Sequence, residues 1–176
     1  MITGFEPVWD SSAKVLIVGS MPSVVSLEKG EYYGHSRNAF WPILCSFFDK
    51  DPRIPYEERC RMLREHGIAL WDAVFSCERE GSLDSAIRDV EPNDFATLFE
   101  ETQIRHIFAN GKTAEKLFLR YVSVPSGVTF HGALPSTSPA YTLSFEKKRT
   151  AWYEVIRVLE EEQKGGQVCR QEIQLD

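Results

Sequence analysis

The chain has 176 residues, of which 43% are hydrophobic and 26% are charged, and its formal net charge is −6 at pH 7. This length and composition are typical of one globular domain, and they exclude a chain that is disordered over most of its length. The negative charge argues weakly against a protein that coats nucleic acids without specificity.

Membrane, secretion and metal signals are missing from the sequence. Apolar runs stay well short of the ~18 residues that a transmembrane helix needs. Residues 1–6 contain no basic region followed by an apolar stretch, so no signal peptide is visible. None of the four cysteines forms a CxxC pair, so a local zinc or iron–sulfur motif is unsupported. We therefore expect a cytoplasmic protein that does not act at a membrane.

Short apolar runs alternate with amphipathic stretches along the chain. Strands are expected at residues 14–19, 68–72, 104–109 and, with a weaker pattern, 128–134. Helices are expected at residues 38–48, 55–66, 93–101, 113–121 and 144–162. Strands that alternate with helices predict an α/β domain with a mostly parallel sheet. We expect one domain over residues 1–162 and a mobile, charged C-terminal tail over residues 163–176.

A ligand site is expected at the carboxyl ends of the predicted strands, where open parallel sheets bind their ligands. The segments at these ends are residues 19–23, Asp72 with its following loop, residues 110–112 and residues 134–140. Two of them contain a Pro-Ser step with small residues, which lets a polymer backbone come close. Residues 19–23 lack the glycine spacing of a P-loop, and Ser136 and Ser138 lack the G-x-S-x-G elbow of serine hydrolases.

An aromatic segment, Y-Y-G-H-S-R-N-A-F-W at residues 32–41, leads into the first predicted helix and includes its first residues. Phe40 and Trp41 are expected in the core. Asn38 has two interpretations that its spacing does not separate: a polar group in a pocket, or the N-cap of the helix. Asp72 is likewise either a site residue or the cap of the turn that follows its strand.

These motifs together resemble the uracil-DNA glycosylase superfamily, and most of all its DNA-deoxyinosine (hypoxanthine-DNA) glycosylase branch. The similarity covers about residues 4–160 and rests on a strand ending in G-x-x-P-S, a strand ending in L-W-D and a late P-S loop. Its most specific part is the aromatic-G-H-x-x-N-x-F-W pattern at residues 33–41. The resemblance implies a three-layer α/β/α sandwich with a central, mostly parallel, four-stranded sheet.

The resemblance also implies an activity. Such a protein is a monofunctional DNA repair glycosylase, which hydrolyses the N-glycosidic bond of a deaminated base and leaves an abasic site. Hypoxanthine is the expected base, with uracil and xanthine as further candidates. The implied partner is DNA that contains deaminated bases, bound by a monomer without a metal or a cofactor. No lysine near the motifs takes the place of a Schiff-base nucleophile, so no lyase step is expected.

The sequence departs from the wider superfamily at two positions. Met21 stands where many members carry an Asp or Asn that positions the attacking water. Leu134 stands where many carry a His or Asn that contacts the departing base. The resemblance implies that Asn38 positions the water instead. The base anion would then depend on backbone N–H groups near Ser20 and Met21, and on His35.

The remaining site residues are also implied by the resemblance. Tyr33 is expected to stack against the flipped base, and Asp72 to accept a hydrogen bond from the base edge. The other expected base-binding residues are Ser20, Met21 and His35. The expected DNA-binding residues, which contact flanking phosphates or fill the gap left by the base, are Ser23, Ser136, Ser138 and Tyr141.

Two other functions stay open at this point. A non-catalytic nucleic-acid-binding module of the same fold is favoured by Met21 and Leu134, which lack the polar groups of other members. A hydrolase of free nucleosides is favoured by the excess of acidic residues, because DNA is itself an anion.

Overall fold

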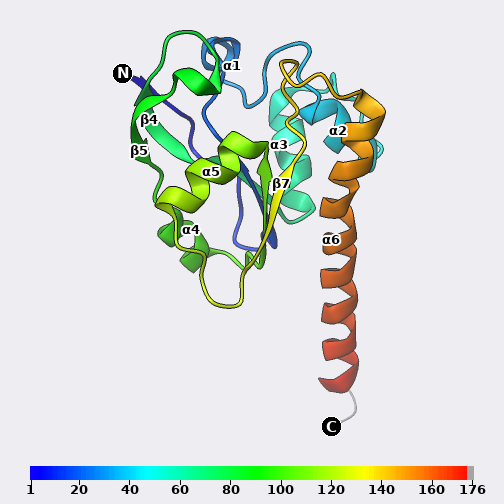
Figure 1. The fold of residues 1–176 in the computed structure, drawn as a ribbon. Coiled ribbons are helices and arrows are strands. Elements are labelled where there is room, and N and C mark those ends of the chain that lie inside the picture. Colours follow the sequence, from blue (N-terminus) through cyan, green and yellow to red (C-terminus); the bar gives the residue numbers. More distant parts are fainter. Residues whose placement is uncertain (174–176) are drawn as a thin grey trace.

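The computed structural model describes residues 1–173, in which strands and helices alternate (Figure 1). The strands are β1 (Ile2–Thr3), β2 (Val15–Gly19), β3 (Ile68–Asp72), β4 (Val74–Glu78), β5 (Arg88–Pro92), β6 (His106–Asn110) and β7 (Thr129–Leu134). The helices are α1 (Val24–Lys29), α2 (Phe40–Phe47), α3 (Tyr56–Glu65), α4 (Phe95–Glu101), α5 (Lys112–Tyr121) and α6 (Phe145–Ile173), with a 3-10 helix η1 (Asp84–Ala86). All the strands and helices expected from the sequence are present, while β1, β4, β5 and α1 were not predicted.

The central sheet has the strand order β3-β2-β6-β7, and each of its pairings is parallel. Every residue of β2 is buried. The side chains of Val15 and Ile17 enter one hydrophobic core, and those of Leu16 and Val18 enter another. A strand covered on both faces needs no polar side, which explains its continuous apolar run. Because the strands are parallel, their carboxyl ends lie along one edge of the sheet.

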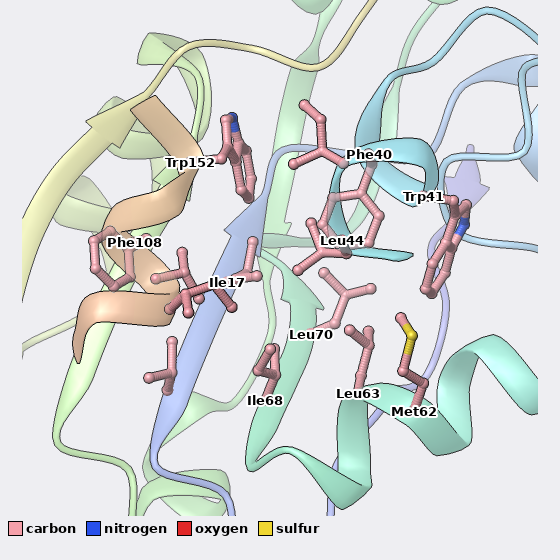
Figure 2. Packing of buried hydrophobic residues seen from close by; sticks show 14 of the residues in the cluster. Ile17, Phe40, Trp41, Leu44, Met62, Leu63, Ile68, Leu70, Phe108 and Trp152 are labelled. Atoms are coloured by element: carbon pink, nitrogen blue, oxygen red, sulfur yellow. The ribbon is translucent and has the colours of Figure 1, made fainter. Parts of the chain in front are cut away.

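Helices cover both faces of this sheet, so the domain has three layers (Figure 1). On one face α2, α3 and α6 contribute Phe40, Leu63 and Trp152, all of them fully buried. Figure 2 shows this core, with aromatic rings from α2 and α6 against aliphatic side chains of β2 and β3. On the other face α4 and α5 contribute Phe95 and Phe118. The predicted α/β/α sandwich with a parallel four-stranded sheet is confirmed.

A second sheet, with the order β1-β4-β5, is antiparallel. Strand β4 begins directly after β3, with Ala73 between them, so this sheet starts at the carboxyl edge of the first. The pairing of β4 with β5 contains register shifts. These shifts and the many acids of the segment break the alternation of apolar and polar residues, which is why the sequence did not predict the sheet.

Helix α6 runs from Phe145 to Ile173 and is longer than predicted. Its first part packs on the sheet, and its C-terminal part extends away from the rest of the domain (Figure 1). The expectation that the helix ends at residue 162 is wrong, because strong helix formers around Gly165 and Gly166 continue it. The predicted tail is therefore helical over residues 163–173, and residues 174–176 lie outside the described part. Within residues 1–173 no helix is long and apolar enough to cross a membrane.

Candidate active site

A cavity of about 360 Å³ opens at the carboxyl edge of the parallel sheet. The strand ends and the loops that follow them provide Gly19, Asp72, Asn110 and Ser136. The segment before α2 and the loop between β4 and β5 line its other sides. This is the edge at which open α/β sheets bind their ligands.

Two buried polar groups, the carboxyl of Asp72 and the hydroxyl of Tyr33, meet beside Gly19 in this cavity. A Cβ atom on Gly19 would clash with Asp72 Oδ1 and would lie 2.8 Å from the Tyr33 hydroxyl. Glycine is therefore required at the end of β2 for both groups to come so close. Among the described residues, neither Asp72 Oδ2 nor the Tyr33 hydroxyl forms a hydrogen bond of ordinary geometry, although the Asn110 side chain lies close enough to the Tyr33 hydroxyl to lower its pKa slightly. Unpaired buried polar atoms are rare in folded proteins, so this pair indicates a place where a ligand supplies the partners.

The ionisation of this pair is strongly perturbed. Burial, and next the charge of Asp84, raises the pKa of Asp72 from 3.8 to about 7, although Arg79 opposes the change. Burial and the nearby Asp72 raise the pKa of the Tyr33 hydroxyl far above its ordinary value, so it stays protonated at neutral pH. Asp72 therefore titrates near neutral pH, and a carboxyl perturbed in this way inside a cavity is typical of a functional site.

Asn38 lies at the start of α2 and lines the cavity. Its Oδ1 accepts a hydrogen bond from the backbone N–H of Phe40 at 2.9 Å. The N-cap of α2 is Ala39, so the N-cap interpretation of Asn38 is wrong, although the Asn38 side chain still satisfies the first N–H of the helix and lines the cavity. Within the described part of the chain, no hydrogen bond engages its Nδ2. Phe40 and Trp41 are buried in the core, as predicted.

The loop after β7 is fixed to the domain at several points. Thr137, which is buried, exchanges two hydrogen bonds with Asn110, at 2.9 and 3.0 Å. Its carbonyl oxygen accepts from the backbone N–H of Ala39 at 3.0 Å, next to Asn38. Lys148 of α6 is also buried, and its Nζ donates to the carbonyl oxygen of Ser138 at 3.0 Å. A loop held in this way presents its outer surface in a fixed geometry.

The structure brings together all but one of the predicted site residues. Those that line the cavity are Ser20, Met21, Ser23, Tyr33, Asn38, Asp72, Ser136, Ser138 and Tyr141. His35 does not line it, and its Nδ1 instead accepts a hydrogen bond from the backbone N–H of Arg37 at 3.1 Å. The expectation that His35 stabilises the departing base has no support in this geometry.

Two predicted residues also have structural roles. Ser23 caps α1, because its Oγ accepts a hydrogen bond from the backbone N–H of Ser26 at 3.1 Å. Met21 is 7% exposed and packs against Val74 and Cys77. Met21 therefore shapes the wall of the cavity with a thioether, which forms only weak hydrogen bonds.

Three residues of the cavity were missed by the sequence analysis: Asn110, Thr137 and Asp84. Asn110 and Thr137 belong to segments that it placed at the site, but it did not single them out. Asp84, whose Oδ1 accepts a hydrogen bond from Ser20 Oγ at 2.8 Å, belongs to a loop of the unpredicted sheet, so no pattern pointed to it. Across the described residues, no group of three or more His, Cys, Asp or Glu side chains could hold a metal ion.

An α/β/α sandwich with a cavity lined by polar side chains at the carboxyl edge of its parallel sheet defines an α/β domain with a ligand site at its strand ends. The sequence model of the Uracil DNA glycosylase superfamily matches residues 7–159, and the chain belongs to this superfamily.

Similar proteins agree with this assignment. Two proteins named Hypoxanthine DNA glycosylase, from Methanosarcina barkeri and Methanosarcina acetivorans, are each 34% identical to the chain, over 158 and 157 residues. These alignments cover 88% of this chain and 97% of each relative. A solution NMR structure from Methanosarcina acetivorans, described as a candidate uracil DNA glycosylase, superposes with a TM-score of 0.74 at 34% identity. That superposition covers 90% of this chain and 98% of the other.

Proposed function

We propose that this protein is a monofunctional DNA glycosylase that hydrolyses the N-glycosidic bond of hypoxanthine in DNA and leaves an abasic site. The observation that carries the proposal is the buried pair of unpartnered polar atoms, Asp72 Oδ2 and the Tyr33 hydroxyl. A purely apolar ligand would leave both atoms unpaired, whereas the edge of a nucleobase offers donors and acceptors to them. The relatives named Hypoxanthine DNA glycosylase support hypoxanthine as the base.

Recognition of the base is assigned to Asp72. Hypoxanthine presents an N1–H donor beside an O6 acceptor, and an ionised carboxylate accepts from that donor. Adenine has a lone pair at N1, which would face the carboxylate, so the normal base is rejected by repulsion. The ring of Tyr33, whose centroid lies 4.2 Å from that of Phe40, is backed by the core and serves as the stacking platform for the base.

Cleavage is assigned to water held by Asn38. The C1′–N9 bond breaks through a transition state in which the sugar is cationic and the base is anionic. A neutral amide is a poor base, but it orients water well, and orientation is what a dissociative reaction needs most. Uracil presents an N3–H donor beside O4, much the same pattern as hypoxanthine, so uracil is a second candidate base.

The cavity accepts a base only after the nucleotide has left the helical stack, which costs a few kcal/mol and less for a mispaired base. We assign the flanking phosphates to Ser23, Ser136 and Ser138, whose hydroxyls and backbone position DNA without reading sequence. Tyr141, which is 49% exposed at the cavity rim, is a candidate to fill the gap in the duplex. We further propose that the protein acts on DNA as a monomer in the cytoplasm.

The proposal is tested with end-labelled duplexes that contain a single deoxyinosine or deoxyuridine, incubated with the protein and then treated with alkali. Strand scission at the deoxyinosine, and none in the matching deoxyadenosine duplex, supports the glycosylase. Binding without scission would instead indicate a non-catalytic module, and release of base from free nucleoside alone would indicate a nucleoside hydrolase. The Asn38→Ala variant controls for a contaminating glycosylase, because its preparation should lose scission.

A further inference from the structure

The loop between β4 and β5, residues 79–87, is held against one side of the cavity and lies beside α1 (Figure 1). Arg79 is buried, and its Nη2 donates to the carbonyl oxygen of Pro22 at 2.6 Å. Further along the loop, Asp84 Oδ1 accepts from Ser20 Oγ at 2.8 Å. These bonds join the loop to the residues that follow β2 and bring the Asp84 carboxylate to the cavity.

Two chemical tasks of the proposed reaction have no residue assigned to them. A cationic sugar is stabilised by a nearby negative charge, and the attacking water must lose a proton as its oxygen bonds to C1′. Asn38 carries no charge, and the thioether of Met21 packs against apolar neighbours. The carboxyl of Asp72 is 3% exposed, and the proposed function assigns it to the edge of the base.

We propose that Asp84 is a second catalytic residue, whose carboxylate stabilises the cationic sugar and takes the proton of the water that Asn38 positions. This inference rests on the proposed glycosylase function. As the C1′–N9 bond breaks, its electron pair leaves with the base, which then gains a proton from solvent. The water oxygen forms the new bond to C1′, and its proton passes to Asp84 and on to solvent.

The surroundings of Asp84 suit this task. The Ser20 hydroxyl holds one carboxylate oxygen in place, and within the described chain no hydrogen bond or ion pair engages Oδ2. Asp84 lines the same cavity as Asp72 and Tyr33, and its charge raises the pKa of both groups. Asp84 is exposed to solvent where it lines the cavity, and the partial desolvation of its carboxyl there raises its pKa, while the Ser20 hydroxyl and Arg79 favour its anion.

Two acids in one cavity can therefore divide the work, as paired carboxyls do in hydrolases that cleave glycosidic bonds. Asp72 lies at the ends of the central strands and meets the base. Asp84 reaches the same cavity from a loop of the second sheet and meets the sugar and water. The second sheet thus contributes to catalysis by delivering a carboxylate that the four-stranded sheet lacks.

The test compares Asp84→Asn with the wild type in single-turnover cleavage of a deoxyinosine duplex, with enzyme in excess. The asparagine keeps an oxygen that accepts the Ser20 hydrogen bond, so the loop stays in place while the charge is lost. Affinity is measured separately, on a duplex with 2′-fluorinated deoxyinosine that resists hydrolysis. The matched control is Glu80→Gln, which removes the same charge from an exposed position of the same loop.

We expect Asp84→Asn to lower the rate by about 100-fold, as for a lost catalytic group, without weakening the binding of the fluorinated duplex. Glu80→Gln should stay within about threefold of the wild type in both measurements.

A rate for Asp84→Asn within about threefold of the wild type overturns the inference, and so does a rate loss matched by an equal loss of affinity. If Asp84→Asn fails to fold, the Asp84→Glu variant decides the question. Cleavage by this variant at about a tenth of the wild-type rate or faster supports the role of the carboxylate, and a folded variant that does not cleave overturns the inference. Failure of the wild type itself to cleave would overturn the proposed function rather than the role of Asp84.

Discussion

Replacing Asp72 with asparagine should make the protein more stable and at the same time less active. The buried carboxyl has a pKa of about 7 in the folded protein, against 3.8 for its ordinary value. One pKa unit corresponds to about 1.4 kcal/mol, so ionising Asp72 costs the folded state roughly 4 kcal/mol relative to the unfolded chain. Asparagine has nearly the same shape and never ionises.

The sign of the effect depends on which state binds the proton. Between about pH 4 and pH 7 the folded protein keeps the Asp72 proton while the unfolded chain has released it, so stability falls as the pH rises. The full cost is present above about pH 7. Asp72→Asn should therefore exceed the wild type by up to roughly 4 kcal/mol at pH 8.5, and by less than about 2 kcal/mol at pH 5.

Denaturant unfolding at these two pH values measures the difference, and a rise in Tm of about 10 °C at pH 8.5 is the matching thermal result. Glu80→Gln controls for the change of net charge, because that exposed residue should alter stability by less than about 0.5 kcal/mol. An Asp72→Asn variant that is equally or less stable at pH 8.5 would refute the argument. Its carboxyl would then be a satisfied structural group, and base recognition would lie elsewhere.

The same variant should also change the ratio of hypoxanthine to uracil cleavage. If the ionised carboxylate accepts the N1–H of the base, wild-type kcat/KM on deoxyinosine should rise as the pH passes through about 7. The Asp72→Asn variant should lose this rise. A wild-type profile that instead falls through the same range would show that the protonated acid reads the base.

Substitutions at four further positions test the site. Asn38→Ala should lower single-turnover cleavage by at least ~100-fold while the circular dichroism spectrum is unchanged, and near-wild-type cleavage would contradict the water-positioning role. Tyr33→Phe, which removes an unpaired hydroxyl, should cost at most about tenfold in kcat/KM, whereas Tyr33→Ala should be far more severe; equal losses would point to the hydroxyl. Lys148→Met should lower the free energy of unfolding by ~1–3 kcal/mol, because the carbonyl of Ser138 loses its buried donor, and the loosened loop should bind every duplex more weakly in fluorescence anisotropy. Ser136→Asp should reduce binding to all substrates through repulsion of phosphate, and an effect confined to one lesion would argue against a phosphate contact.

The central sheet could be predicted because its strands carry their own signal. Strands β2, β3 and β6 are short, largely apolar runs that end at Gly19, Asp72 and Asn110, and parallel packing brings those ends together. Strand β7, which precedes the Pro-Ser loop, has the weaker pattern. The aromatic segment before α2 was likewise specific enough to place Tyr33 and Asn38 at the cavity.

What the sequence could not provide depends on contacts between distant segments. Asp84 lies 64 residues after Ser20, and their hydrogen bond depends on a sheet whose irregular strands have no clear alternation. Burial of Asp72 is equally invisible in the sequence, which on its own leads us to expect little change in stability from Asp72→Asn. The C-terminal helix was underestimated because Gly165 and Gly166 look like a helix stop, although the residues around them favour helix.

The loss of stability that the buried Asp72 carboxyl causes is itself an argument that this carboxyl binds a ligand. The register of the sheet pairs Gly19 of β2 with Asp72 of β3, so the absence of a side chain on one strand leaves room for the carboxyl on the next. This arrangement buries an acid with one unpaired oxygen, although asparagine would fit the same space without a charge. Selection for stability alone would favour the amide. A carboxyl held there at a disadvantage is expected only where its charge acts on a ligand, as active sites commonly trade stability for function.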